Sequence, residues 1–214
     1  MTRELAIANL IAVGVRDAEP RFFLSAGDPP SKQSILRAAL KLFVEHGLAG
    51  TNIRMIAKES GYTNPAMFKF FDSKEALALY LFERCYARLH RQIASAASGK
   101  PFRKALGGVI DAFLRAMDED LEAALFVQDA LRELWPRLPA SARKSSILRT
   151  LRELFERGMG EGVVAGYSSS DVPVATLVGL MAQFGRMVYF GEIEGPVRRR
   201  RPELELAITR MLKG

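Results

Sequence analysis

The 214-residue chain is predicted to be all-α, with an N-terminal three-helix domain and a larger C-terminal helical domain. Leu and Ala are frequent and runs of β-branched residues are scarce, which favours helices. Apolar residues recur at the three- and four-residue spacing of one helix face. No segment of useful length alternates apolar and polar residues as a half-buried strand would. The chain is long enough to bury a substantial core.

The first predicted helix covers residues 31–46. Residues 1–30 are expected to form an extension that ends in the turn-rich AGDPP, because Pro29 and Pro30 stop any earlier helix. Ser31 can cap the helix that follows, and Gly47 ends it. Its apolar face is predicted to carry Ile35, Ala39, Leu42, Phe43 and His46.

Two short helices follow. The second is capped by Thr51 or Asn52 and ends at Gly61. The third is capped by Thr63 and carries Pro65 in its first turn, where a proline loses no helical hydrogen bond. Two short helices joined by a turn that contains glycine predict a helix–turn–helix.

Helical patterns continue to the end of the chain. Turn-forming residues separate these patterns from one another, so each is predicted to be a separate helix. The predicted ranges are 73–95, 102–117, 119–135, 141–162, 171–191 and 202–213.

Composition limits the possible functions. The net charge of +7 suits a polyanionic partner such as nucleic acid or an anionic membrane surface. Cys85 is the single cysteine, which excludes an intrachain disulfide and fits a reducing compartment. The only histidines, His46 and His90, have no ligands at metal-binding spacing, and no catalytic constellation can be assembled. We therefore expect no metal, no cofactor and no enzymatic activity.

No signal peptide and no membrane-spanning segment is expected. The apolar residues 5–15 are too short to span a bilayer, and no A-x-A-like cleavage site follows them. The apolar stretch 172–190 contains Pro173, Gln183 and Arg186, and is interpreted as a core or interface helix. A cytoplasmic protein is expected.

The second helix of a helix–turn–helix enters the DNA major groove with its N-terminal residues nearest the bases. Asn64 can contact adenine, and Pro65 or Ala66 can contact a thymine methyl group. Lys69 is expected to face phosphate. So short a helix is unstable alone, so it must be held by an apolar face, for which the sequence offers Met67, Phe70 and Phe71.

Basic residues gather in the same region. Between residues 32 and 91 there are ten Lys or Arg residues and five Asp or Glu residues, a net charge of +5. A surface that faces phosphate is therefore expected in this third of the chain. The run RRRR at residues 198–201 is interpreted as a solvated loop remote from DNA.

Residues 31–80 resemble the N-terminal domain of the TetR family of bacterial transcriptional regulators. The resemblance rests on the Ala-Leu-x-Leu-Phe and Gly pattern of the first helix, Thr51, Ile56-Ala57, Gly61-x-Thr63, Phe71 and Lys74-Glu75-Ala76-Leu77. It implies phosphate contacts at Thr51, Arg54, Thr63 and Lys74, and base contacts at Asn64, Pro65 and Ala66. Phe68 stands where the family usually has Tyr, so one backbone contact is in doubt.

The resemblance also implies a function. Residues 31–75 would bind DNA, and residues 76–214 would bind a ligand and dimerise. The expected protein is a repressor that leaves a palindromic operator when a small, mostly apolar molecule binds. A family member that senses no ligand, or an activator, is the alternative. A helical-bundle enzyme and a membrane-surface protein are more distant possibilities.

Two sets of residues are candidates for the C-terminal functions. Large apolar side chains that could line a ligand cavity, or form ordinary core, are Phe113, Met117, Phe126, Trp135 and Phe155. The helix 171–191 is apolar nearly all round, so it must bury two faces, and a homodimer satisfies this. The seam assigned to the dimer contains Val174, Val178, Met181 and Gly185, together with Ile208 of the last helix. A second seam beside it, which could equally face the partner, contains Leu177, Leu180, Phe184 and Met187.

Overall fold

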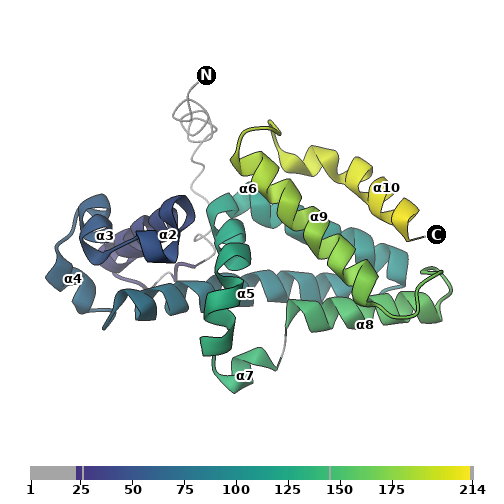
Figure 1. The fold of residues 1–214 in the computed structure, drawn as a ribbon, viewed down its shortest axis with the longest axis horizontal. Coiled ribbons are helices and arrows are strands. Elements are labelled where there is room, and N and C mark those ends of the chain that lie inside the picture. The colour runs from purple at the N-terminus through teal and green to yellow at the C-terminus, as the bar shows by residue number, and fades with distance from the viewer. Residues whose placement is uncertain (1–22, 26, 145, 213–214) are drawn as a thin grey trace.

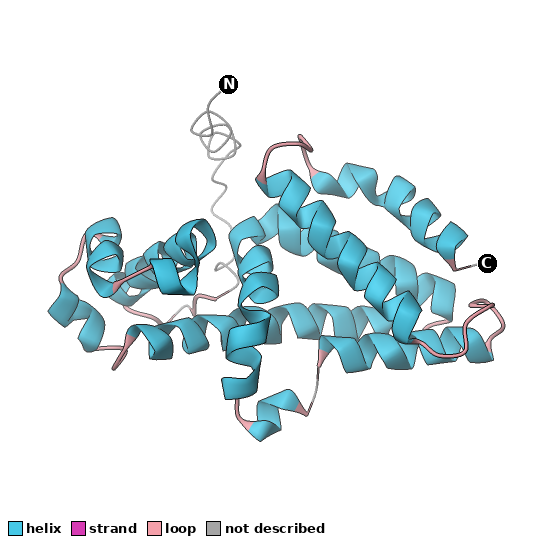
Figure 2. Ribbon diagram, in the orientation of Figure 1, coloured by secondary structure: helices cyan, strands magenta, loops and turns pink. Residues whose placement is uncertain are grey.

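The computed structural model describes residues 23–25, 27–144 and 146–212, so predictions about residues 1–22 lie outside it. The described residues form helices joined by loops, without a strand (Figure 2). The α-helices are α2 (Pro30–Gly50), α3 (Ile53–Ser60), α4 (Asn64–Phe68), α5 (Lys74–Ala97), α6 (Phe102–Leu134), α7 (Ala140–Arg143), α8 (Ile147–Gly160), α9 (Asp171–Tyr189) and α10 (Arg201–Met211). Two 3-10 turns, η1 (Trp135–Arg137) and η2 (Val197–Arg200), precede α7 and α10.

The helices fall into two groups (Figure 1). At one end of the molecule α2, α3 and α4 form a small cluster. From this cluster α5 leads into the larger group, and α6 packs against α5. Helices α8, α9 and α10 lie beside α6, so α5 and α6 form the connection between the two groups. The all-α prediction with a smaller N-terminal domain is confirmed.

The predicted break between residues 117 and 119 is a kink within one helix. Asp120 has φ −158° and ψ 82°, which interrupts α6. Its Oδ1 atom accepts a hydrogen bond of 3.1 Å from the N–H of Ala123 and so caps the second half. The predicted helix 141–162 is divided in two, because Ser146 begins α8 by accepting a hydrogen bond from the N–H of Arg149.

Aromatic side chains join the kinked half of α6 to the N-terminal cluster. Phe126 stacks on Phe43 of α2, with ring centroids 5.7 Å apart, and its ring meets Phe82 of α5 edge-on at 6.4 Å. Further along, Trp135 lies 4.8 Å from the ring of Tyr86 on α5. The two groups of helices therefore share a continuous apolar core.

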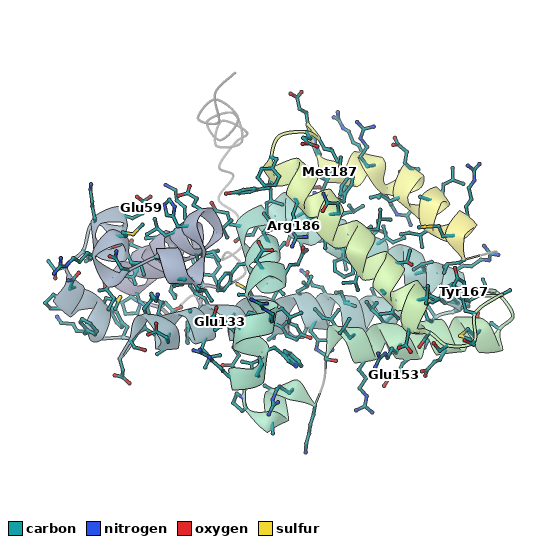
Figure 3. All side chains as sticks on the ribbon, viewed as in Figure 1. Glu59, Glu133, Glu153, Tyr167, Arg186 and Met187 are labelled. Carbon is teal, nitrogen blue, oxygen red and sulfur yellow. The ribbon has the colours of Figure 1, made fainter. Side chains whose placement is uncertain are left out.

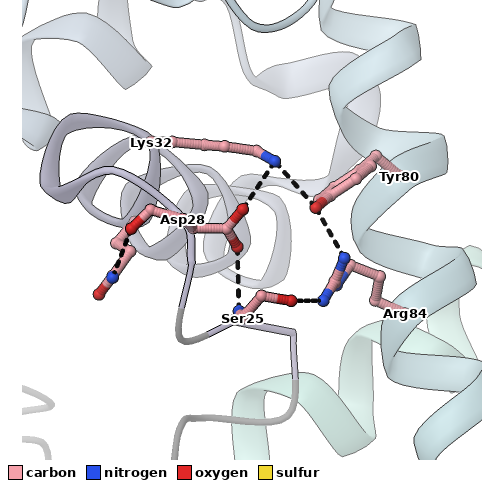
Figure 4. A network of polar contacts seen from close by, with 6 residues as sticks. Ser25, Asp28, Lys32, Tyr80 and Arg84 are labelled. Carbon is pink, nitrogen blue, oxygen red and sulfur yellow. Dashed lines mark hydrogen bonds and ion pairs between the residues drawn. The ribbon is translucent and has the colours of Figure 1, made fainter.

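A polar network, here called the clasp, fastens the chain before α2 to α5 (Figure 4). Lys32 donates hydrogen bonds to Asp28 at 2.8 Å and to the hydroxyl of Tyr80 at 3.0 Å. Arg84 donates to the same hydroxyl at 2.8 Å and also to Ser25. These five residues hold the entry to α2 against the middle of α5.

The arginine run is solvent-accessible, as expected, and three of its four side chains also pair with acidic residues. Arg198 lies 2.8 Å from Asp118, and Arg201 lies 2.6 Å from Asp111 and 2.7 Å from Glu205. The Arg201 side chain passes so close to α6 that a Cβ on Gly107 would lie 2.9 Å from its guanidinium. The run therefore fastens the start of α10 to α6.

Candidate nucleic-acid interface

The helix–turn–helix is built by local capping. The side chain of Asn52 accepts a hydrogen bond of 3.1 Å from the N–H of Met55 and begins α3. Gly61 ends α3 with φ 74°, a left-handed conformation that favours glycine. Thr63 stands at the cap position of α4, but its side chain makes no capping hydrogen bond.

The five-residue helix α4 is held by its inner face. Met67 is fully buried and Phe71, just after the helix, is buried, while Phe70 packs half-buried against the core. This agrees with the packing expected from the sequence. Phe68 points outward and is 48% exposed, so an apolar ring stands on the outer side of α4.

Most of the predicted DNA-contacting residues lie at the surface. Thr63, Pro65, Phe68, Lys69 and Arg54 are exposed. Asn64 and Ala66 are half-buried. Among the described residues, Arg54 and Lys69 have no ion-pair partner, in contrast to Lys41, whose ammonium lies 2.6 Å from Glu59.

An open hollow of about 660 Å³ brings several of these residues together. It lies where α3, α4 and α5 begin. Its lining consists of Thr51, Asn52, Ile53, Arg54, Asn64, Phe68, Asp72, Ser73, Lys74 and Glu75. Five of the nine predicted DNA contacts therefore share one concave surface. Asn52 and Ser73, which the DNA prediction omitted, are the caps of α3 and α5, and the cap pattern is the signal that could have found them.

Two predicted phosphate contacts are directed into the protein. Thr51 is 1% exposed, and its hydroxyl lies 3.0 Å from the carbonyl oxygen of Leu42 and 2.9 Å from that of Gly47. Lys74 donates hydrogen bonds to the carbonyl oxygens of Leu48, at 2.7 Å, and of Thr51, at 3.0 Å. Their polar groups already have partners within the chain.

The candidate ligand residues line neither the hollow beside α4 nor the one beside α10. Phe113, Met117, Phe126 and Phe155 are buried, and Trp135 is half-buried. Phe155 packs on Phe102, whereas Phe126 stacks on Phe43. A second hollow, of about 80 Å³, lies between α6 and α10 and is lined by none of the five. In this conformation these residues are packed core.

The seam assigned to the dimer faces the chain's own core, so that assignment needs correction. Val174, Met181, Gly185 and Ile208 are buried within the single chain, and only Val178 is half-exposed. A Cβ on Gly185 would lie 3.3 Å from Met117 of α6, which shows how closely that face is packed. Of the second seam, Leu177 is buried, while Leu180, Phe184 and Met187 are half-exposed.

A different apolar face points outward. On α9 it includes Val172, which is 59% exposed, and the exposed Gly179, and Phe190, just after the helix, is 67% exposed. On α10, Leu206 and Met211 are also exposed. Arg186, near the end of α9 (Figure 3), pairs with Asp129 of α6 at 2.7 Å. By length and composition alone α9 could cross a membrane, a test that core helices of soluble proteins also pass.

Comparison with known proteins gives consistent relatives. Residues 35–81 match the family described as "Bacterial regulatory proteins, tetR family". The HTH-type transcriptional repressor KstR2 of Rhodococcus jostii is 28% identical over 156 residues, which cover 70% of this chain and 74% of that protein.

Solved structures share the fold. The ketosteroid transcriptional regulator KstR2 of Mycobacterium tuberculosis aligns with a TM-score of 0.73 at 17% identity, over 88% of this chain and 97% of that one. The fatty acid degradation regulator FadR from Bacillus halodurans aligns with a TM-score of 0.67 at 17% identity, over 86% and 97%.

Proposed function

We propose, on the premise that residues 35–81 belong to the TetR family of bacterial regulators, that the chain is a sequence-specific DNA-binding transcriptional regulator. The observation that carries the proposal is the outer face of α4. Its inner face is fixed by Met67, and its outer face presents Asn64, Pro65 and Phe68 beside the exposed Arg54. This combination of base-reading and phosphate-binding groups suits a helix in the major groove.

The regulator is proposed to be a repressor that acts as a homodimer. The relative from R. jostii is described as a repressor. The outward apolar face of α9 and α10 supports a two-fold partner, because burying it would remove Val172, Phe190 and Leu206 from water. A two-fold dimer carries two copies of α4, which fits a palindromic operator with half-sites about one helical turn apart.

An apolar effector is proposed to release the operator. The names of the structural relatives refer to ketosteroids and to fatty acid degradation, which supports an apolar compound for this chain. Residues 31–75 then bind DNA, and residues 76–214 bind the effector and the second subunit. An effector that prefers a conformer with wrongly spaced recognition helices weakens operator binding by linkage, with α5 as the connecting element.

Selection of bound duplexes from a random pool, followed by sequencing, tests the DNA-binding proposal. We expect enrichment of an inverted repeat. A pool that stays random after repeated rounds contradicts sequence-specific binding.

The effector is tested separately, with the selected duplex. Long-chain fatty acids and sterols are added while operator affinity and melting temperature are followed. A compound that lowers operator affinity and raises the melting temperature supports the sensor. If no apolar compound changes either quantity, the ligand-independent regulator is the better description.

A further inference from the structure

Lys74 occupies an unusual electrostatic position. It is the first residue of α5, whose cap is Ser73. A cation in the first turn of a helix faces the positive end of the helix dipole, so it gains nothing from its own helix. Its ammonium instead contacts the carbonyl oxygens of Leu48 and Thr51, with the carboxylate of Glu75 3.8 Å away.

The carbonyls that it contacts belong to the joint between α2 and α3, residues 47–52. Gly47, with φ 73° and ψ 169°, interrupts α2, so carbonyls near it lack regular helical partners. The buried hydroxyl of Thr51 lies within hydrogen-bonding distance of two carbonyl oxygens in this region. Together the two side chains contact the carbonyl oxygens of Leu42, Gly47, Leu48 and Thr51.

This joint leads directly into the DNA-facing surface. Asn52 caps α3, and Arg54 lies in the first turn of α3 on the wall of the 660 Å³ hollow. The position of Arg54 relative to α5 therefore depends on how the joint is held. Lys74 is the side chain that holds it from the α5 side.

We propose that Lys74 is a positioning residue for DNA binding, which fastens the α2–α3 joint to the start of α5 and does not itself neutralise a phosphate. The inference rests on the proposed DNA-binding function. Two of the three N–H donors of the ammonium are engaged by these carbonyls, and drawing the ammonium out to a phosphate would give up hydrogen bonds that are among the stronger ones in proteins. The family resemblance had implied a phosphate contact at this residue.

The test compares Lys74→Met with Lys69→Met on the selected operator and on a scrambled duplex, across a series of salt concentrations. Lys69 is exposed and lies at the end of α4, so it serves as the matched phosphate-binding residue. Circular dichroism first establishes that each variant is folded. Lys69→Met is expected to weaken both duplexes alike and to reduce the salt slope by about 0.9 for each phosphate that is no longer neutralised.

Lys74→Met is expected to behave differently. Operator affinity should fall about tenfold, roughly what one charge-assisted hydrogen bond is worth, while the salt slope stays at the wild-type value. A displaced α3 would no longer fit the operator sequence. Affinity for the scrambled duplex should change less, because that duplex offers no such fit to lose. A slope that falls as it does in Lys69→Met, or an unchanged ratio of operator to scrambled affinity, overturns the proposal.

Lys74→Arg is a second variant for the same comparison. It replaces Lys74→Met if the methionine variant does not fold. It keeps the charge, but its planar guanidinium does not reproduce two ammonium bonds directed at separate carbonyls. Reduced operator affinity with an unchanged salt slope supports positioning. Full wild-type affinity overturns it. If the wild-type protein itself selects no duplex, the DNA-binding proposal fails, which is a distinguishable result.

Discussion

Asn64 and Met67 belong to a helix that is only five residues long, in which Met67 is fully buried and Asn64 is half-buried. Removing the buried residue would release the helix, whereas changing Asn64 alters only what the helix presents to DNA. Effects on binding and on folding can therefore be separated at single residues of α4.

Asn64→Ala is expected to cost about 1–3 kcal/mol of operator binding and to relax the preference at one base pair in each half-site, since the alanine cannot form the bidentate hydrogen bonds to adenine. The melting temperature should not change, because the residue is half-exposed. Competition binding with single-base operator variants measures both effects. Unchanged affinity and unchanged preference would mean that α4 is not the reading helix.

The sequence predicted α4 well, because the residues that determine this helix are close together in the chain. Gly61 and Pro65 mark the turn and the first helical turn, and the spacing of Met67 and Phe71 predicts the buried face. The inward direction of Thr51 and Lys74 could not be predicted in the same way. It depends on carbonyls at the end of α2, which become neighbours only once the three helices have packed.

At the scale of elements, the kink of α6 and the clasp each depend on a few polar atoms. The kink places Phe126 over both α2 and α5. The clasp holds the entry to α2. From the sequence, the kink was expected to be a break between residues 117 and 119, whereas the residue that caps the second half of α6 is Asp120.

Asp120→Ala is expected to lower the free energy of unfolding by about 0.5–2 kcal/mol, the usual cost of losing a helix cap. Asp120→Asn keeps an oxygen acceptor for the N–H of Ala123 and should lose less. Urea unfolding compares the two variants with the wild type. Equal stability of Asp120→Ala and the wild type would show that the cap does not maintain the kink.

Tyr80→Phe removes a hydroxyl that accepts from both Lys32 and Arg84 but keeps the ring, over which the Lys32 ammonium lies 4.6 Å from the centroid. We expect a loss of about 1–3 kcal/mol in unfolding free energy, because both donors are charged. Tyr62→Phe is the control, since Tyr62 is at the surface and its change should stay within about 0.5 kcal/mol. Matching stabilities of the two variants would contradict a stabilising clasp.

The clasp should also respond to acid. Burial alone would raise the pKa of Asp28, but hydrogen bonds from Lys32 and from the Ser25 N–H hold this pKa below its usual value. Its contribution to stability is then present above the unfolded value of about 3.9 and is lost as the pH falls through the lowered pKa. The stability difference between the wild type and Asp28→Asn should therefore be smaller at pH 3 than at pH 7. A difference independent of pH would exclude the charge of Asp28 as its source.

At the scale of the whole molecule, the outer face of α9 is the surface on which the proposed dimer depends. The sequence could not show which face points outward, because a helix that is apolar all round has no periodicity to orient it. The same difficulty applies to Phe113 and Phe155. Large apolar residues at helical spacing look alike whether they line a cavity or fill a core, and here they fill a core.

Gly179→Glu is expected to yield a folded monomer with weakened operator binding. A Cβ at Gly179 meets nothing within 4 Å in its own chain, so the substitution has room in the single chain. Met181→Asp, two residues away on the buried face, should unfold the chain. Sedimentation and circular dichroism distinguish these results. A Gly179→Glu protein that sediments as a dimer would place the interface elsewhere.

The stack of Phe43 on Phe126 has a consequence for protein engineering. A designer who transplants the first 75 residues onto another regulator of the same architecture would cut through this shared core, leaving one ring of the pair behind. The chimaera would need a compatible aromatic residue in the recipient's equivalent of the kinked helix, and a partner for Lys32 at the equivalent of Tyr80. Exchange of operator specificity is therefore better attempted by grafting the outer residues of α4 alone.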